Sequence, residues 1–444
     1  MNRPKIHLTP TRGWMNDPNG FVYYNGEYHL FYQYFPYDTE WGTMHWGHAT
    51  SRDLINFENH PIAIYPTKQY DRNGCFSGTA LIKDNKLHFY YTGIKYLRSE
   101  DENIHKPYDN NSYEACQVKI SSLDGYKFDN YNDKKIIIEP IRDDKLGHKT
   151  HTRDPKVWKH GDEYSMILGS KFKREGESRY IGEALFYTSK DGEEWQYKNR
   201  CYDETIGDMW ECPDLLQVDG KYILIMSPEH ITNDGVNYEN NSIYTIVNYD
   251  EKTCDMKIVN KYCYLDQGLD VYAPQTTLDK EGNRIVIGWV RMPEKFQGED
   301  WIGMMTLPRV IHVIDNTVYF TVPKYIERKF NKHIEVAEFD IDKPCRIKAN
   351  LLASGTVDIG GYKIYVSNDR IVADRSNVFV ERNLKNINFS TPKLDRRYDL
   401  DIYVDKGIIE IFVNDGRYVI TNVVYNMNNS IEYSNLCELE IYQL

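Results

Sequence analysis

The chain has 444 residues, of which 54 are Lys or Arg and 66 are Asp or Glu, so its formal net charge is −12. A surface of that charge repels polyphosphates and anionic membranes at long range, and we therefore expect neither nucleic acid nor a membrane as the main partner. The length exceeds what one ordinary hydrophobic core serves, which predicts two domains, or a large repeat-built domain with a smaller companion.

The amino-terminal residues contain no apolar run long enough for a signal-peptide core, and no later stretch approaches the length of a membrane span. These features predict a cytoplasmic protein. Eight cysteines are scattered along the chain without a Cys-x-x-Cys pair. Neither a zinc site nor a disulfide framework is indicated, and buried free thiols are the simplest expectation.

Five segments share one pattern: a short polar element with Pro or Gly, an apolar strand, a turn and a second apolar strand. They are DPNGFVYYNGEYHLFYQ from Asp17, SGTALIKDNKLHFYYTG from Ser77, DPKVWKHGDEYSMILGS from Asp154, ECPDLLQVDGKYILIMS from Glu211 and YAPQTTLDKEGNRIVIGWV from Tyr272. The Asn-Gly and Asp-Gly turns at residues 25–26 and 219–220 accept the positive φ of tight hairpins. Each segment therefore predicts a β-hairpin.

The spacing of these segments predicts how the hairpins assemble. Their opening Pro or Gly residues stand at positions 18, 78, 155, 213 and 274, and further hairpin patterns start at Ala49, Lys119 and Phe186. A repeat of this length is typical of four-stranded blades. We therefore predict an all-β protein with a five-bladed β-propeller over residues 1–310, in which the first strand of each blade lines the central channel.

Three carboxylates occupy nearly the same place in their repeats, just ahead of the predicted innermost strand: Asp17, Asp154 and Glu211. Such positions converge at the axis of a propeller, so the pattern predicts a carboxylate cluster. Asp before Pro is also a common turn-opening residue, and for each carboxylate taken singly a turn role is an equal alternative. The three together favour a catalytic site.

The segments that carry these carboxylates resemble the three signature motifs of glycoside hydrolase family 32. They are WMNDPNG at residues 14–20, RDP at residues 153–155 and WECP at residues 210–213. The similarity continues through YHLFYQYFPY from Tyr28, WGTMHWGHATSRDL from Trp41, CFSGTA from Cys75, DVYAPQ from Asp270 and GWVRMP from Gly288. That family holds invertases, sucrose-6-phosphate hydrolases, inulinases and levanases, and the resemblance covers essentially the whole chain.

The resemblance implies hydrolysis of terminal β-D-fructofuranosyl linkages with retention, through a covalent fructosyl-enzyme and without a cofactor. Asp17 would be the nucleophile, Glu211 the general acid/base and Asp154 a stabiliser of the transition state. Two carboxyl groups about 5–5.5 Å apart suit such a mechanism, because they can act on opposite sides of the anomeric carbon.

Other residues match family positions around the fructosyl unit. The resemblance implies substrate contacts from Asn16, Gln33, Trp41, Phe76, Ser77 and Arg153, with Tyr272 and Trp289 as pocket walls. Arg153 beside an acidic centre would orient it, or simply neutralise its charge. Trp289 in an apolar strand is equally well explained as a core residue. His45 and His48 invite a metal interpretation, but we predict no metal, since nothing else supplies ligands and this hydrolysis needs none.

Beyond residue 310 the repeat stops. We interpret residues 311–332 as a linker and residues 333–444 as a second domain. RRYDLDIYVDKGIIEIFVNDGRYVIT from Arg396 alternates apolar and polar residues between Asp-Gly turns, which predicts an antiparallel β-sandwich. It resembles the carboxy-terminal domain of the same family. Its role could be structural, carbohydrate-binding or oligomer-forming, and the sequence leaves these alternatives open.

The preferred function is hydrolysis of sucrose 6-phosphate or sucrose, with a small sugar as the partner. An exo-acting hydrolase of inulin, levan or fructo-oligosaccharides is the alternative. An inverting hydrolase of the related five-bladed pentosidase type would hold its two carboxylates about 6.5–9.5 Å apart. A non-catalytic sugar-binding propeller is the simplest alternative, and the intact Asp, Asp and Glu argue against it.

Overall fold

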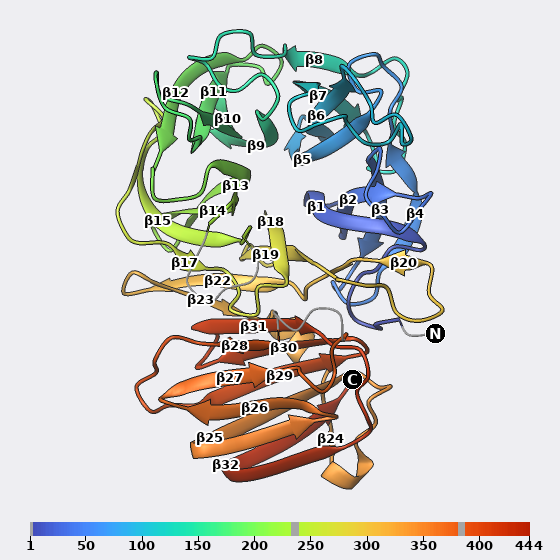
Figure 1. The fold of residues 1–444 in the computed structure, drawn as a ribbon, viewed down its shortest axis with the longest axis vertical. Coiled ribbons are helices and arrows are strands. Elements are labelled where there is room, and N and C mark those ends of the chain that lie inside the picture. Colours follow the sequence, from blue (N-terminus) through green and yellow to red (C-terminus); the bar gives the residue numbers. More distant parts are fainter. Residues whose placement is uncertain (1–2, 232–238, 381–386) are drawn as a thin grey trace.

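The computed structural model describes residues 3–231, 239–380 and 387–444. Five antiparallel β-sheets stand around a central axis, and a β-sandwich packs against one side of the ring (Figure 1). The predicted all-β architecture, a five-bladed propeller followed by a sandwich, is therefore confirmed. The one α-helix in the described part of the chain, α1 (Lys324–Glu327), has four residues, and no helix there is long and apolar enough to cross a membrane.

The five innermost strands contact one another in a ring around the axis, and each is the first strand of its blade. They are β1 (Gly13–Tyr24), β5 (Gly74–Lys83), β9 (Arg153–His160), β13 (Met209–Val218) and β18 (Val271–Leu278). Their hairpin partners are β2 (Glu27–Phe35), β6 (Lys86–Tyr96), β10 (Glu163–Phe172), β14 (Lys221–Glu229) and β19 (Arg284–Val290). All five predicted hairpins form.

The outer half of each blade is a second pair of strands. These pairs are β3 (His45–Ser51) with β4 (Glu58–Ile64), β7 (Tyr113–Ser122) with β8 (Lys135–Ile138), β11 (Ile181–Ser189) with β12 (Gln196–Tyr202), β15 (Ile243–Asp250) with β16 (Asp255–Ile258), and β22 (Arg309–Ile314) with β23 (Thr317–Thr321). Short strands β17 (Cys263–Tyr264) and β21 (Met304–Met305) extend the last two blades. The outer hairpins predicted from Ala49, Lys119 and Phe186 are β3–β4, β7–β8 and β11–β12.

The amino-terminal residues close the ring. Strand β20 (Trp301–Ile302), which follows β19 in the chain, pairs in parallel with β1 through Gly13 and Trp301. The backbone N–H of Met305 also donates to the carbonyl of Leu8 at 2.9 Å. The last blade is thus joined to the first by backbone hydrogen bonds, which satisfy an edge that β1 would otherwise expose.

Strands β22 and β23 fall largely within the stretch that we interpreted as a linker. They complete the fifth sheet, because β22 pairs with β19 and β23 pairs with β22. We therefore propose that the propeller ends after Thr321 rather than at residue 310, and that the connection is limited to the short segment around α1.

The sandwich is built around two long strands, β25 (Cys345–Ile359) and β32 (Ile431–Gln443), which pair along most of their length. The first half of β25 pairs with β29 (Asp399–Asp405) and its second half with β26 (Tyr362–Ser367), with a register shift between them. The two long strands therefore pass from one layer to the other. The remaining strands are β24 (Lys332–Ile334), β27 (Arg370–Asp374), β28 (Asn388–Ser390), β30 (Ile408–Val413) and β31 (Tyr418–Val423), and a 3-10 turn spans Val336–Glu338.

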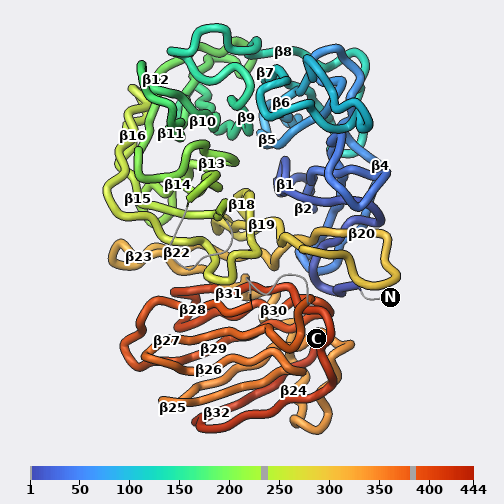
Figure 2. The backbone as a smooth tube through the Cα atoms, in the orientation of Figure 1, coloured from blue at the N-terminus to red at the C-terminus, as the bar shows by residue number. Residues whose placement is uncertain are grey.

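A buried interface joins the two domains, and the tube in Figure 2 shows β30 and β31 lying directly beneath the propeller. Phe412 of the sandwich belongs to the same apolar cluster as Phe320 of the propeller. Inside this interface, His7 lies 3.0 Å from both Asp405 and Glu410, and these side chains are at most 1% exposed. Removing one partner from such a buried ionic group lowers the free energy of unfolding by about 3–5 kcal/mol. This group therefore helps to hold the two domains together.

Candidate active site

Each of the five innermost strands carries a β-bulge in which two of its residues face one residue of the neighbouring strand. The bulged pairs are Asn16-Asp17, Phe76-Ser77, Asp154-Pro155, Cys212-Pro213 and Ala273-Pro274. A bulge redirects side chains and tolerates proline, which cannot donate to the ladder. The Pro and Gly residues that defined the repeat therefore mark the places where the strands turn their side chains toward the axis.

The three carboxylates occupy successive steps of this bulge and lie within the innermost strands rather than just ahead of them. Glu211 directly precedes its bulge, Asp154 is the first bulged residue and Asp17 the second. Asp154 has a φ of 63°, a strained conformation for a residue with a side chain. Its backbone N–H donates to the Thr92 hydroxyl at 3.0 Å, which holds this conformation.

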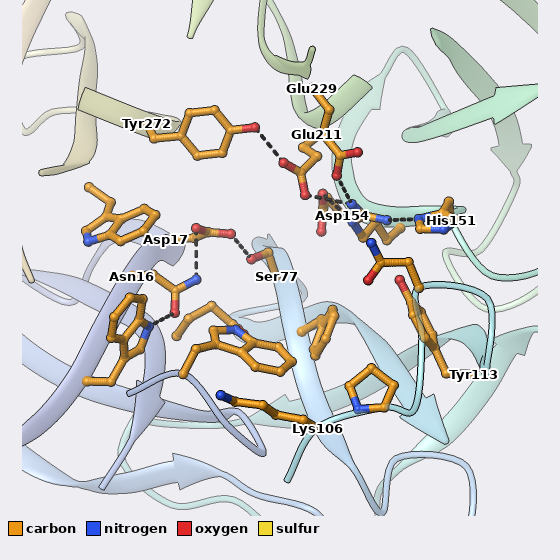
Figure 3. A pocket seen from close by; sticks show the side chains of 18 of the residues that line it. Asn16, Asp17, Ser77, Lys106, Tyr113, His151, Asp154, Glu211, Glu229 and Tyr272 are labelled. Atoms are coloured by element: carbon orange, nitrogen blue, oxygen red, sulfur yellow. Dashed lines mark hydrogen bonds and ion pairs between the residues drawn. The ribbon is translucent and has the colours of Figure 1, made fainter. Parts of the chain in front are cut away.

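The bulges surround a cavity of about 540 Å³, and Figure 3 shows side chains that line it. The eleven residues named from the sequence all line it: Asn16, Asp17, Gln33, Trp41, Phe76, Ser77, Arg153, Asp154, Glu211, Tyr272 and Trp289. The structure thus brings the whole predicted set together. Their roles toward a substrate stay predictions.

Asp17 is held by two side chains from adjacent blades. Asn16 donates to its Oδ1 at 3.0 Å and the Ser77 hydroxyl donates to its Oδ2 at 2.5 Å. The Trp14 indole N–H in turn donates to the Asn16 Oδ1 at 2.7 Å, which fixes the orientation of that amide. Burial raises the pKa of Asp17, and the hydrogen bond from Ser77 opposes this change by stabilising the carboxylate.

Glu211 lies between a hydroxyl and a guanidinium. Tyr272 donates its hydroxyl to Oε2 at 2.5 Å, and Arg153 Nη2 donates to Oε1 at 2.6 Å (Figure 3). Burial and the nearby Glu211 raise the pKa of Tyr272, so this phenol stays protonated. Both oxygens of Glu211 therefore accept hydrogen bonds from fixed donors. Whether Arg153 orients the acidic centre or neutralises its charge stays a prediction.

Asp154 is the most completely enclosed of the three carboxyl groups. Burial raises its pKa to about 7, against the attraction of Arg153, whose Nε lies 3.8 Å from Oδ2. The backbone N–H of Cys212 donates to Oδ2 at 3.0 Å. A carboxyl group that titrates near neutrality can both accept and donate hydrogen bonds, which suits contact with sugar hydroxyls.

Aromatic rings form the walls of the cavity. Trp14 and Trp289 meet with ring centroids 5.8 Å apart, and Trp41 meets Phe76 at 5.8 Å in an edge-to-face contact. Within the described residues the indole N–H of Trp289 has no hydrogen-bond partner. Its position on the cavity favours the wall over the core interpretation. Gln33 donates to the Cys75 carbonyl at 3.0 Å, which fixes its amide at the cavity wall.

Three neighbours of the carboxylates did not come out of the sequence. The Cys212 thiol lies 3.5 Å from Asp17 Oδ2 and 3.7 Å from Asp154 Oδ2, although the sequence suggested only a plain buried thiol. Lys171 of β10 and Glu229 of β14 also line the cavity. Cys212 directly follows Glu211 in the sequence, and this adjacency could have indicated its place beside the carboxylates. Glu229 stands at the end of a hairpin with no motif around it.

The residues considered for a metal lie apart from the three carboxylates. His45 Nδ1 lies 2.9 Å from the Thr43 carbonyl, and His48 contacts His29 at 3.1 Å. Elsewhere in the described part of the chain, Asp208, Glu229 and His230 bring possible ligand atoms within 4.8 Å of one another. Because His230 already pairs with Asp208 at 2.9 Å, an ionic contact accounts for this group.

The sequence matches two family models along most of its length. Residues 7–323 match the glycosyl hydrolases family 32 N-terminal domain, and residues 324–439 match the glycosyl hydrolases family 32 C terminal domain.

Among characterised relatives, a sucrose-6-phosphate hydrolase of Vibrio alginolyticus is 31% identical over 94% of this chain and 85% of its own. A raffinose invertase of Escherichia coli is 30% identical over 97% and 91%. Among solved structures, a sucrose-6-phosphate hydrolase from Lactobacillus gasseri superposes with a TM-score of 0.84 at 25% identity, covering 100% of this chain and 93% of that one. A family 32 β-fructofuranosidase from Bombyx mori gives 0.81 at 26%, covering 100% and 94%.

Proposed function

Because the chain belongs to glycosyl hydrolase family 32, we propose that it is a retaining β-fructofuranosidase acting on sucrose 6-phosphate or sucrose. One observation carries the proposal: Asp17 and Glu211 line one cavity, each held by its own set of donors. A carboxylate and a separately oriented carboxyl group on either side of a glycosidic bond are what double displacement requires.

In the first step Asp17 attacks C2 of the fructosyl unit. The donors of Asn16 and Ser77 aim its carboxylate, and the bond to the leaving oxygen breaks as Glu211 transfers its proton to that oxygen. The product of this step is a fructosyl ester of Asp17. In the second step Glu211, now a carboxylate, takes a proton from water, and the resulting hydroxide attacks C2 and releases Asp17.

Asp154 is proposed to bind ring hydroxyls of the fructosyl unit. Its oxygen accepts from the Cys212 backbone, and its fixed backbone conformation holds it within the same ring of strands as Asp17. Hydrogen bonds to sugar hydroxyls that strengthen as positive charge develops on the ring stabilise the transition state. This role involves no proton transfer to the leaving group.

Two observations support a phosphorylated substrate. Several relatives at about this identity are sucrose-6-phosphate hydrolases, including those of Vibrio alginolyticus and Bacillus subtilis. In addition, Lys171 lines the cavity while only 8% exposed, and its ammonium group lies 4.4 Å from the centre of the Tyr180 ring. An ammonium group at the wall of a cavity is suited to an anionic ligand. The cytoplasmic location and an oligomer formed through the sandwich stay predictions.

The test is release of fructose by purified protein from sucrose 6-phosphate, sucrose, 1-kestose, inulin and levan at matched concentrations. We expect the highest kcat/KM with sucrose 6-phosphate or sucrose. Preference for kestose or the polymers would replace this proposal with the fructan-hydrolase alternative. No fructose from any substrate, from protein that unfolds cooperatively, would overturn the proposed function.

A further inference from the structure

Arg153 is shared between two glutamates. Its Nη2 donates to Glu211 Oε1 at 2.6 Å and to Glu229 Oε1 at 3.0 Å, and its side chain is only 7% exposed. Its Nη1 faces His151 Nδ1 at 3.0 Å. Burial, followed by the charge of Arg153, lowers the pKa of His151 to about 2, so this ring is neutral and accepts the hydrogen bond. A single cation therefore serves both carboxylates.

Glu229 is placed beside Glu211 by the hairpin that carries both. It is the last residue of β14 and pairs with Met209, two residues before Glu211 on β13. The side chains of Glu211 and Glu229 are 21% and 20% exposed, so water screens them only in part. Burial and the adjacent Glu211 raise the pKa of Glu229. The two carboxylates compete for Arg153 and repel each other.

The other charged and titratable groups around this pair come from neighbouring strands and from the loops beside them. They are Asp17, Asp154, Tyr113, His151, Lys171, Tyr272, Asp208 and His230. In the described part of the chain, only Arg153 and Tyr272 bond directly to the Glu211 carboxyl group. Asp208 is paired with His230 and does not contact Arg153. Asp154 also pairs with Arg153, through Nε at 3.8 Å, but Glu229 is the acidic residue among them that shares Nη2 with Glu211.

We propose that Glu229 is a positioning residue for Glu211: by taking part of the Arg153 guanidinium and adding a second negative charge, it limits how strongly Arg153 stabilises the Glu211 carboxylate. The inference rests on the proposed function, in which Glu211 must be protonated when the leaving group departs. Without Glu229, Nη2 of Arg153 would pair with Glu211 alone and would stabilise its carboxylate more strongly. The acid would then lose its proton at lower pH.

The pH dependence of kcat/KM for sucrose tests this directly, because its alkaline limb reports the acid of the free enzyme. In Glu229→Gln we expect the alkaline limb to move about one pH unit lower, and the acidic limb, set by Asp17, to stay in place. Asp208→Asn removes a nearby charge without touching Arg153, and its profile should match that of the wild type. An unmoved alkaline limb in folded Glu229→Gln, or an equal shift in Asp208→Asn, overturns the inference.

A second substrate separates this role from a structural one. With p-nitrophenyl β-D-fructofuranoside the leaving group needs little protonation, so wild type and Glu229→Gln should have nearly the same alkaline limb. A shift as large as that with sucrose would contradict the inference.

Glu229→Asp keeps the negative charge but moves it away from Arg153 and Glu211, so its alkaline limb should shift by an intermediate amount. This variant also tests the inference if the Gln variant fails to fold. A shift in Glu229→Asp that matches or exceeds that of the Gln variant, or no shift where Glu229→Asp alone folds, overturns the inference. An inactive wild type would instead contradict the proposed function itself.

Discussion

The hydroxyl of Ser77 donates to Oδ2 of Asp17 at 2.5 Å, across the boundary between the first and second blades. Asp17 is therefore positioned by two sheets at once. The hydrogen bond also offsets part of the rise in pKa that burial imposes on Asp17. An ionised nucleophile in a desolvated cavity depends on this donor.

Ser77→Ala should accordingly move the acidic limb of kcat/KM to higher pH by about one to two units, since a hydrogen bond to a charged group contributes about 1.5–3 kcal/mol. Ser77→Thr, which keeps the hydroxyl, should leave the limb near its original place. The measurement is the pH profile with sucrose between pH 4 and pH 8. Identical acidic limbs in the Ala and Thr variants would show that the hydroxyl does not set the ionisation of Asp17.

Asp17→Asn should abolish turnover, by roughly 10⁴-fold or more, because an amide cannot form the ester-linked intermediate. The amide keeps the shape of the carboxyl group, so the thermal midpoint should change little. Steady-state fructose release and a thermal unfolding curve on the same preparation check both points. Activity within tenfold of the wild type would mean that Asp17 is not the nucleophile.

The first fructose released should have the same anomeric configuration as the substrate. Double displacement through Asp17 inverts C2 twice, whereas direct attack of water inverts it once. Proton NMR of early product, before mutarotation, distinguishes the two. Inverted product would favour the pentosidase-like mechanism and would assign Asp17 as a base instead of a nucleophile.

Lys171→Met should lower kcat/KM for sucrose 6-phosphate by about tenfold or more, and that for sucrose much less, if the ammonium pairs with the phosphate. Lys173→Met is a matched control. Both ammonium groups lie over the Tyr180 ring, at 4.4 and 4.1 Å, but Lys173 is exposed and is absent from the cavity lining. Equal losses on both substrates in Lys171→Met would place the phosphate elsewhere.

The interface histidine makes stability depend on pH. Burial acts to lower the pKa of His7, but hydrogen bonds to Asp405 and Glu410 outweigh it and raise the pKa to about 9. The charged form is thus favoured in the folded state. Its contribution, about 3 kcal/mol, is complete below the unfolded value of about 6.5 and is lost as pH rises through 9.

Urea unfolding at pH 6, 7.5 and 9 checks this contribution. His7→Gln should destabilise the protein most at pH 6 and should flatten the decline in stability toward pH 9. His333→Gln, an exposed histidine on β24, should follow the wild type. If the free energy of unfolding of the wild type rose between pH 7.5 and 9, and this rise were absent from His7→Gln, the raised pKa of His7 would be contradicted.

The propeller could be predicted from the sequence because each blade repeats the same local pattern, a Pro or Gly element at the bulge followed by a tight turn. The register of the bulges could not be predicted. Pro18 follows its bulge whereas Pro155 and Pro213 lie inside theirs, so alignment on proline places Asp17 one step from its true position relative to Asp154 and Glu211. That distinction depends on hydrogen bonds to the neighbouring strand, which no local pattern reports.

Residues outside the motifs were missed for a similar reason. Glu229 acquires its meaning only from Arg153, which lies 76 positions earlier, and His7 meets partners about 400 positions later. Strands β22 and β23 lie outside the five repeat segments, and most of their residues were interpreted as a linker although Pro308 directly precedes β22. Contacts between distant parts of the chain, rather than element types, account for what could not be predicted.

The parallel pairing of β20 with β1 determines when the propeller can close during synthesis of the chain. Asp17, the proposed nucleophile, is synthesised with the first blade, but the strand that covers the open edge of that blade is synthesised only with Trp301 and Ile302. Domains generally fold as units once their sequence has emerged. The nascent chain therefore contains every carboxylate of the site long before the ring of blades can close. A polypeptide that ends before residue 300 would contain these carboxylates but could not form the closed propeller around them.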